Sequence, residues 1–405
     1  MTSSPVSSDN LPQVDHPDTL KARVPIELGG SRLDKVVTEL FPDYSRSRLQ
    51  TWLKQGRVWV NGVAAQKGNQ KVQGLDWVVL HPGVLEHMQA LVPQDMGLDI
   101  LGQTDEYTVV NKPAGLVVHP APGHWSGTLM NGLLHQDAGL VHVPRAGIVH
   151  RLDADTTGLM VVARTSETQV KLVQMLQARI VKRVYLALVW GRISQPVTVN
   201  RPLGRDPKNR LRMAVVDHGK PAVTHFQPVA HGSLMDVPVT LMVCRLETGR
   251  THQIRVHAQF AGFALVADPV YKIKGAGSHS ALRMPEIPLP DGGSFSRQAL
   301  HATHLSFPDP AWFRIRSEGV SMAQWESELE SSPWPEYIAP APADLCALGQ
   351  LAGIDFLSDS LHQSVLEQAH QHKASALVRF EHELEDEEFD EDDEGDYDVE
   401  VVEEA

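Results

Sequence analysis

The spacing of apolar residues predicts two short helices near the start of the chain. Apolar side chains follow a helical period over residues 33–40 and again over residues 49–53, so each helix would have one face for a core. Ser31 and Ser45 stand where the N-caps of these helices are expected, and Gly56 stands where the second helix should stop. The pattern therefore predicts a helical pair at the start of a small folded module.

A hairpin completes this module. Residues 58–60 and 63–65 are largely apolar and flank Asn61-Gly62, a pair that favours a type I′ turn between two strands. We therefore place a module of two helices and a hairpin at residues 23–82. Between residues 31 and 82 it carries eight basic residues against four acidic ones. The basic residues are Arg32, Lys35, Arg46, Arg48, Lys54, Arg57, Lys67 and Lys71.

Beyond residue 98 the pattern changes to apolar runs that are typical of buried strands. A helix is predicted to begin at Ser166 and to keep the 3.6-residue period as far as Ile180. The basic residues that follow it, Arg179, Lys182 and Arg183, suit the C-terminal end of a helix. Strands are predicted over residues 107–110, 159–163, 184–189 and 239–243, with a short continuation of the first at 117–118.

A polar turn directly precedes the predicted strand at residues 159–163. It contains Asp153 and is flanked by Gly147 and Gly158. Loops at the end of a core strand often present reactive groups. An ordinary turn of Asp, Thr and Gly has the same composition. The residues by themselves therefore leave a reactive carboxylate and a simple turn as two open interpretations.

Four sequence blocks, taken together, resemble the signatures of the RluA family of pseudouridine synthases. In chain order they are Asn111-Lys112-Pro113-Ala114-Gly115, His150-Arg151-Leu152-Asp153 with Asp155-Thr156-Thr157-Gly158, Gly249-Arg250-Thr251-His252-Gln253-Ile254-Arg255-Val256-His257, and Gln298-Ala299-Leu300-His301-Ala302. The resemblance extends over about residues 25 to 350 and is closest to the RluD subgroup, which acts on large-subunit (23S) ribosomal RNA. The first module is similar to the S4 RNA-binding domain.

The resemblance implies an α+β pseudouridine synthase fold, with a mixed, largely antiparallel sheet flanked by helices and loops. It implies that Asp153 is the catalytic residue, that Tyr185 stacks on the target uracil, and that Arg255 pairs with Asp153. A buried structural pair of Arg255 and a carboxylate would make the same contact. If this third block is extended, Ile254 and Val256 point away from Arg255.

Turning uridine into pseudouridine needs no redox change and no external group, and a carboxylate can act as its nucleophile or stabiliser. The chain lacks a Gly-rich phosphate loop and a nicotinamide fingerprint, so we expect no cofactor. A lone Asp153 also argues against a glycosidase, which uses two carboxylates. Attack of Asp153 on the sugar, attack on the base and a glycal route all stay open.

RNA contacts are expected at local clusters of basic residues. By the resemblance, Arg151 would fill the space of the extruded base or hold phosphate. Residues 201–220 contain six basic residues against Asp206 and Asp217, and we interpret them as an exposed basic loop suited to phosphates. Solvated surface charges without a specific role are the alternative. The candidate RNA-binding residues are Arg151, Arg46, Arg48, Arg57, Arg205 and Arg210.

Charge and composition complete the expected organisation of the chain. The net charge of −14 comes from the end of the chain, because residues 381–405 contain sixteen acidic residues and no Lys or Arg. The remaining 36 basic and 34 acidic residues give +2. We expect a disordered leader at 1–22, the S4-like module at 23–82, a linker at 83–98, the catalytic domain at 99–350, a possible helix at 351–380 and a disordered acidic tail at 381–405.

The remaining features bear on location, metals and partners. Two distant cysteines, Cys244 and Cys346, and a start without basic or apolar segments suit the cytoplasm. No apolar run is long enough for a membrane span, and the histidines between 119 and 150 match no zinc spacing. We expect a monomeric enzyme that binds ribosomal RNA. The alternatives are a synthase for other RNA sites, including transfer RNA, and a non-catalytic ribosome-assembly factor.

Overall fold

The computed structural model describes residues 19–376, apart from 83–85, 122–123, 274–281, 283, 285, 291, 313–326 and 328–330. The chain divides into two compact units, Met1–Gln89 and Ala90–Ala405. This division falls inside the predicted linker at 83–98. The predicted acidic tail and residues 1–18 of the predicted leader lie outside the described residues.

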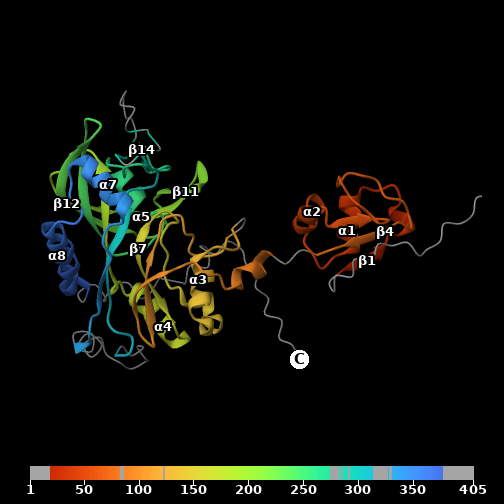
Figure 1. Ribbon diagram of the computed structural model, residues 1–405, viewed down its shortest axis with the longest axis horizontal. Helices are drawn as coiled ribbons and strands as arrows, with labels where there is room; N and C mark the ends of the chain where they lie inside the picture. The colour runs from red at the N-terminus through yellow and green to blue at the C-terminus, as the bar shows by residue number, and fades with distance from the viewer. Residues whose placement is uncertain are drawn as a thin grey trace, which may run out of the picture. The chain divides into compact units, whose positions relative to one another are not determined.

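The small unit contains the predicted helical pair and hairpin, with two further strands (Figure 1). Asn61 and Gly62 have φ angles of 50° and 80°, so the predicted turn is confirmed. Ser45 caps the second helix, and its side chain accepts a hydrogen bond from the Arg48 amide. The N-cap of the first helix is Arg32 instead of Ser31. The elements are β1 (Leu20–Arg23), η1 (Ile26–Leu28), α1 (Leu33–Leu40), α2 (Arg46–Lys54), β2 (Val58–Val60), β3 (Val63–Ala64) and β4 (Trp77–Leu80).

A four-stranded sheet of order β1-β4-β2-β3 packs against α1 and α2 in this unit. The apolar faces of both helices are buried, with Leu33, Val36 and Trp52 in one core with the strands. Strand β1 pairs with β4 from Leu20 onward, so the folded unit starts within the leader predicted at 1–22. Burial of these apolar faces leaves the charged side chains of the helices at the surface.

One mixed sheet forms the centre of the large unit, and among the described residues its strand order is β5-β6-β7-β16-β8-β13-β12-β9, with β17 paired to β16. The pairing of β7 with β16 is parallel, and the other pairings in this sheet are antiparallel. The strands are β5 (Asp99–Gln103), β6 (Tyr107–Lys112), β7 (Thr157–Ala163), β8 (Lys182–Trp190), β9 (Val197–Asn200), β12 (Val223–Leu234), β13 (Val237–Leu246), β16 (Leu300–Ser306) and β17 (Glu336–Ile338). Two small hairpins stand apart from it: β10 (Leu203–Asp206) with β11 (Asn209–Val215), and β14 (Ile287–Pro288) with β15 (Ser294–Phe295).

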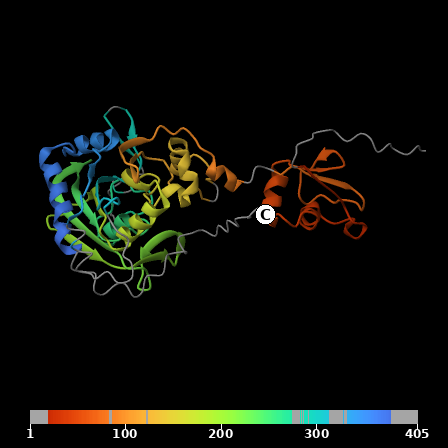
Figure 2. The ribbon, with the colours of Figure 1, turned by 90° about the horizontal axis from the view of Figure 1, so that it is seen from below.

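Helices cover both faces of this sheet. Along β8, Val184, Leu186 and Leu188 belong to a core shared with α7 and α8, whereas Tyr185 and Ala187 face a second core shared with α3 and α5. A third core packs α4 against β6 and β7. Figure 2 shows α7 and α8 in blue along one side of the green strands. The helices are η2 (Glu86–Leu91), α3 (Leu129–Gln136), η3 (Ala138–His142), η4 (Pro144–Gly147), α4 (Ser166–Gln177), α5 (Gln253–Phe260), α7 (Ala343–Ala352) and α8 (Asp359–Ala376).

The four main strands and the helix from Ser166 are confirmed, and three local predictions are wrong. Residues 253–257 of the third block belong to the helix α5 and not to an extended segment, and residues 253–258 are buried on all sides. Residues 201–220 contain the hairpin β10–β11 and not an irregular loop. Residues 117–118 do not continue a strand; their carbonyls accept hydrogen bonds from the first amides of α3. The helix expected within 351–380 is α8, which packs onto β8 and β13.

Candidate active site

Asp153 lies in a tight turn between η4 and β7. The amide of Thr156 donates a hydrogen bond to the carbonyl of Asp153 at 3.0 Å, which closes the turn. Gly158 follows with a φ angle of 113°, and a Cβ there would collide with the carbonyl of Ala302 in β16. Glycine is therefore required where β7 approaches β16. The side chain of Asp153 is 18% exposed, so it can meet a ligand.

The first block supports this turn from β6. Lys112 is fully buried, and its ammonium donates hydrogen bonds to the carbonyls of Ala154 (2.6 Å), Pro113 (2.8 Å) and Leu116 (2.9 Å). Burial lowers the pKa of Lys112 to about 8, against the opposing effect of nearby carboxylates. Lys112 thus connects the turn at residues 113–116 to Ala154, the residue after Asp153.

The fourth block holds the other side of the turn. The side-chain amide of Gln298 donates to Thr156 Oγ1 at 3.1 Å, and His301 Nδ1 lies 2.9 Å from Thr157 Oγ1. Arg297, just before this block, donates to the carbonyl of Asp155 at 3.3 Å. All of these side chains are buried or nearly so. Contacts from two distant parts of the chain thus fix the backbone that carries Asp153.

Arg255 of α5 joins two carboxylates. Its Nη1 donates to Asp153 Oδ2 at 2.7 Å, while Nε and Nη2 donate to the two oxygens of Asp268 at 2.7 and 3.0 Å. Burial alone would lower the pKa of Arg255, but Asp268 and Asp153 outweigh it and raise that pKa. Asp268 also accepts hydrogen bonds from the amides of Val270 and Tyr271. The predicted contact between Arg255 and Asp153 is confirmed.

His252 approaches the second oxygen of Asp153. Its Nε2 lies 3.7 Å from Asp153 Oδ1, and its Nδ1 is 2.8 Å from the hydroxyl of Tyr271. That hydroxyl accepts a hydrogen bond from the amide of Met213 in β11. Burial lowers the pKa of His252, so the ring is neutral at pH 7. Within the described residues Asp153 Oδ1 accepts no hydrogen bond, which leaves this oxygen available to a reactant.

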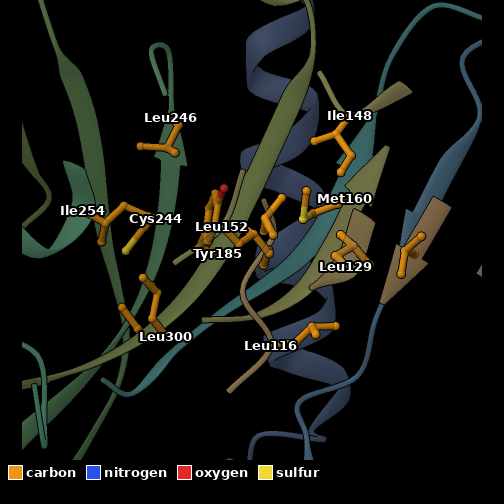
Figure 3. Close-up of a cluster of buried hydrophobic side chains, with 14 of the residues drawn as sticks. Leu116, Leu129, Ile148, Leu152, Met160, Tyr185, Cys244, Leu246, Ile254 and Leu300 are labelled. Atoms are coloured by element: carbon orange, nitrogen blue, oxygen red, sulfur yellow. The ribbon is translucent and has the colours of Figure 1, made fainter. Parts of the chain in front are cut away.

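Tyr185 extends from β8 on the sheet face that also carries α5. Figure 3 shows its ring beside Leu152, the residue before Asp153, within the core that includes Cys244 and Ile254. Burial raises the pKa of the Tyr185 hydroxyl, and the charge of Asp153 adds to this shift although Arg183 opposes it. The phenol is therefore neutral at pH 7, and its ring lies beside the neighbour of Asp153 in the sequence.

Comparison with known proteins identifies the fold and the chemistry. Residues 106–260 match the model of the RNA pseudouridylate synthase family, and residues 31–78 match the S4 domain. The Ribosomal large subunit pseudouridine synthase D of Neisseria meningitidis serogroup B is 43% identical to this chain over 381 residues. The match covers 94% of this chain and 91% of that protein. The chain belongs to the pseudouridine synthase family.

The protein of the same name from Pseudomonas aeruginosa is 45% identical over 76% of this chain and 91% of its own length. Among solved structures, Human RNA Pseudouridylate Synthase Domain Containing 1 is 23% identical, covers 68% of this chain and 99% of that chain, and has a TM-score of 0.42. The two family matches and the two relatives show that the present chain is an RNA pseudouridine synthase with an S4 domain in its small unit.

The predicted RNA-binding residues of this synthase lie at the surface of both units. Arg151 is exposed beside Asp153 and forms no hydrogen bond or ion pair within the described part of the chain. Arg205 and Arg210 are exposed on the β10–β11 hairpin, where Arg205 donates weakly to the carbonyl of Arg210 at 3.4 Å. The small unit presents Arg46 on the surface, with Arg48 and Arg57 partly exposed.

Three residues of this site were missed in the sequence. His252 belongs to the third block, but it is the N-cap of α5 with a left-handed φ angle of 57°, and no local sequence pattern indicates that conformation. The buried polar residues of α5 hide that helix, because they satisfy their hydrogen bonds inside the core, as Gln253 does with Thr224. Asp268 and Tyr271 have no local sequence signal, since only the fold brings them to Arg255.

Where the structure describes side chains, no three His, Cys, Asp or Glu residues gather in a way that could hold a metal ion. No helix in the described ranges is long and apolar enough to span a membrane.

Proposed function

We propose that this enzyme converts uridine to pseudouridine in large-subunit ribosomal RNA, with Asp153 as its catalytic carboxylate. The observation that carries this proposal is the carboxylate itself: Oδ2 accepts a hydrogen bond from the buried Arg255, Oδ1 accepts none within the described residues, and the side chain is 18% exposed. Relatives that match over most of their length are named for the ribosomal large subunit, which supports the choice of RNA.

The reaction breaks the N1–C1′ bond of uridine and joins C1′ to C5; C5 loses its proton and N1 gains one, so substrate and product are isomers. Asp153 would supply the negative charge or nucleophile at the reacting sugar or base. Arg255 would hold this carboxylate in one orientation, which lowers the entropy cost of reaching the reacting atoms. Tyr185 would hold the uracil through its ring, because its neutral phenol is a poor base.

The target uridine must leave its stacked position to reach Asp153, at a cost of roughly a few kcal/mol. Arg151 is exposed next to Asp153 and would hold the RNA at the vacated position. Arg46, Arg48 and Arg57 of the S4 domain, with Arg205 and Arg210 of the hairpin, would contact phosphates. Such contacts position RNA and contribute salt-dependent affinity without reading its bases.

Pseudouridine mapping of ribosomal RNA tests this proposal. Cells that lack this protein should lose one or more pseudouridines from the large-subunit RNA, and the wild-type gene should restore them. A gene carrying Asp153→Asn should not, although the protein should accumulate and fold normally, because the side chain is nearly isosteric. Restoration by Asp153→Asn would rule out the catalytic role of Asp153.

The same maps separate the alternatives. Loss of pseudouridine from transfer RNA with unchanged ribosomal RNA would indicate a different substrate. Defective ribosome assembly that Asp153→Asn repairs as well as wild type would indicate a binding role without chemistry.

A further inference from the structure

Among the described residues, Arg183 is a buried cation that has no counter-ion. It belongs to β8, is 7% exposed, and forms no hydrogen bond or ion pair within the described part of the chain. Its Nε is enclosed and has no partner. The causes of its lowered pKa, burial first, include no carboxylate. Other buried arginines of this unit, such as Arg255 and Arg297, each bind a carboxylate with two nitrogens.

Arg183 lies two residues before Tyr185 in the strand β8. Residues two apart in a strand share a face, so Arg183 points to the same side of β8 as Tyr185. Each residue affects the electrostatics of the other. The guanidinium packs against Gly249, where any Cβ would collide with its Nη1. The charge of Arg250 also acts on Arg183 and is repulsive.

An unpaired buried charge is unfavourable, because desolvation is not offset by a partner. Two positive charges near each other, at the edge of a site that takes RNA, instead suit an anion that arrives with the substrate. A guanidinium binds phosphate oxygens with two parallel N–H groups. The substrate class of the family provides phosphates on both sides of every nucleotide.

We propose that Arg183, with Arg250 beside it, binds a backbone phosphate next to the uridine held against Tyr185. This inference rests on the RNA substrate and on the role proposed for Tyr185. Arg183 would thus be a binding residue that anchors the extruded nucleotide by its backbone while Tyr185 contacts its base.

The test compares Arg183→Met with Arg183→Lys in the full-length Asp153→Asn protein, which prevents turnover. Binding of a large-subunit RNA fragment is measured across a salt series, and thermal unfolding is measured with and without inorganic phosphate. Arg183→Met should bind about tenfold more weakly, with a salt slope smaller by about one. Its own thermal midpoint should be equal or higher, because the unpaired charge is gone. Arg183→Lys should recover part of the affinity.

Inorganic phosphate should raise the thermal midpoint of the parent protein more than that of Arg183→Met, because it stabilises a state that it binds. The control is Leu211→Met, an exposed change on the β10–β11 hairpin, which should alter neither binding nor stability. Unchanged affinity and salt slope in Arg183→Met would overturn the phosphate site. A lower midpoint with unchanged binding would show a structural role.

If Arg183→Met does not fold, Gly249→Ala supplies the second variant. Its methyl group would displace the guanidinium without removing the charge, so RNA affinity should fall, and wild-type affinity would refute the proposal. The proposed function fails separately, by unchanged ribosomal pseudouridines in cells without the protein. A full-affinity Arg183→Met would remove the phosphate site alone.

Discussion

In the large unit, Arg255 and Arg297 are buried and each binds a carboxylate with two nitrogens, whereas the arginines of the small unit face solvent. The side chains of Arg255 and Arg297 are 5% and 7% exposed. Arg46 and Arg57 form no side-chain hydrogen bond or ion pair among the described residues. The first group fixes the geometry of the enzyme, and the second group is available to a polyanion.

The difference follows from desolvation. A buried guanidinium that loses its carboxylate leaves an uncompensated charge, so such pairs are sensitive to removal of one partner. An exposed arginine keeps its hydration, and its removal costs the folded protein little. The buried arginines should therefore matter for stability and catalysis, and the exposed ones for salt-dependent binding.

The largest effect is expected from Arg255→Ala. This change leaves the fully buried Asp268 without its cation and frees Asp153 to rotate. We expect a loss of unfolding free energy on the order of 3–5 kcal/mol, measured by denaturant titration, and loss of pseudouridine formation in single turnover.

The matched control is Arg205→Ala on the exposed hairpin. Its effect on stability should stay within about 0.5 kcal/mol, and its single-turnover rate at saturating RNA should be close to wild type. Equal destabilisation by the two changes would contradict the contrast between buried and exposed arginines.

Acid should destabilise the large unit before the small one. Burial, as the main cause, lowers the pKa of His150 to about 3 and those of His119, His301 and His304 to about 4. Unfolded histidine has a pKa of about 6.5, so below that pH the unfolded chain binds more protons and stability falls. The loss should be on the order of 1 kcal/mol per pH unit for each of these histidines. The window runs from pH 6.5 down towards 4.

Hydrogen exchange on the full chain, corrected for the intrinsic effect of pH, measures the loss of stability in each unit as the pH falls. Protection of β8 and β16 should fall faster between pH 7 and 5 than protection of β4, because His81 is the one histidine of the small unit whose side chain is described. His304→Leu should make the dependence shallower, since neither ring nitrogen of His304 has a hydrogen-bond partner and Nε2 has only a 3.8 Å contact with Glu336 to lose. Parallel loss in both units would contradict the prediction.

Elements with a strong local pattern could be predicted from the sequence. The hairpin at Asn61-Gly62 and the strand β7 follow from turn chemistry and from a continuous apolar run. The helix α5 could not be recognised, because its polar residues are buried and paired, which removes the contrast between an apolar and a polar face. The β10–β11 hairpin was missed for another reason: Leu203 is the one buried residue in its two strands, so they lack the apolar run of a core strand.

The site residues also differ in whether the sequence could predict them. Asp153 and Arg255 stood out because they belong to blocks that resemble a family, and their contact is confirmed. The contact of Asp268 with Arg255, and the lack of a carboxylate beside Arg183 in the described residues, depend on which segments the sheet brings together. No local sequence pattern indicates either of them. Their roles can be inferred only from the packed structure.

The smallest effect on the chemical step is expected from removal of the S4 domain, which contains none of the candidate catalytic residues Asp153, Tyr185 and Arg255. Deletion of residues 1–82 should weaken RNA binding and flatten its dependence on salt, because it removes the exposed arginines of the small unit. A full-length variant with Arg46→Gln, Arg48→Gln and Arg57→Gln keeps the S4 domain but loses these three charges. It therefore separates the effect of the charges from the effect of the missing domain. If these arginines each meet a phosphate, the salt slope of this variant should fall by about two to three.

Single-turnover rates at saturating RNA distinguish binding from chemistry in both variants. The binding energy of a remote module can also orient a substrate, so a modest fall in rate is compatible with the assigned roles. The fall in affinity should be much larger than the fall in rate, since Asp153, Tyr185 and Arg255 are unchanged. Truncated protein that binds RNA as tightly as the whole chain at every salt concentration would show that the exposed arginines of the small unit do not contact RNA.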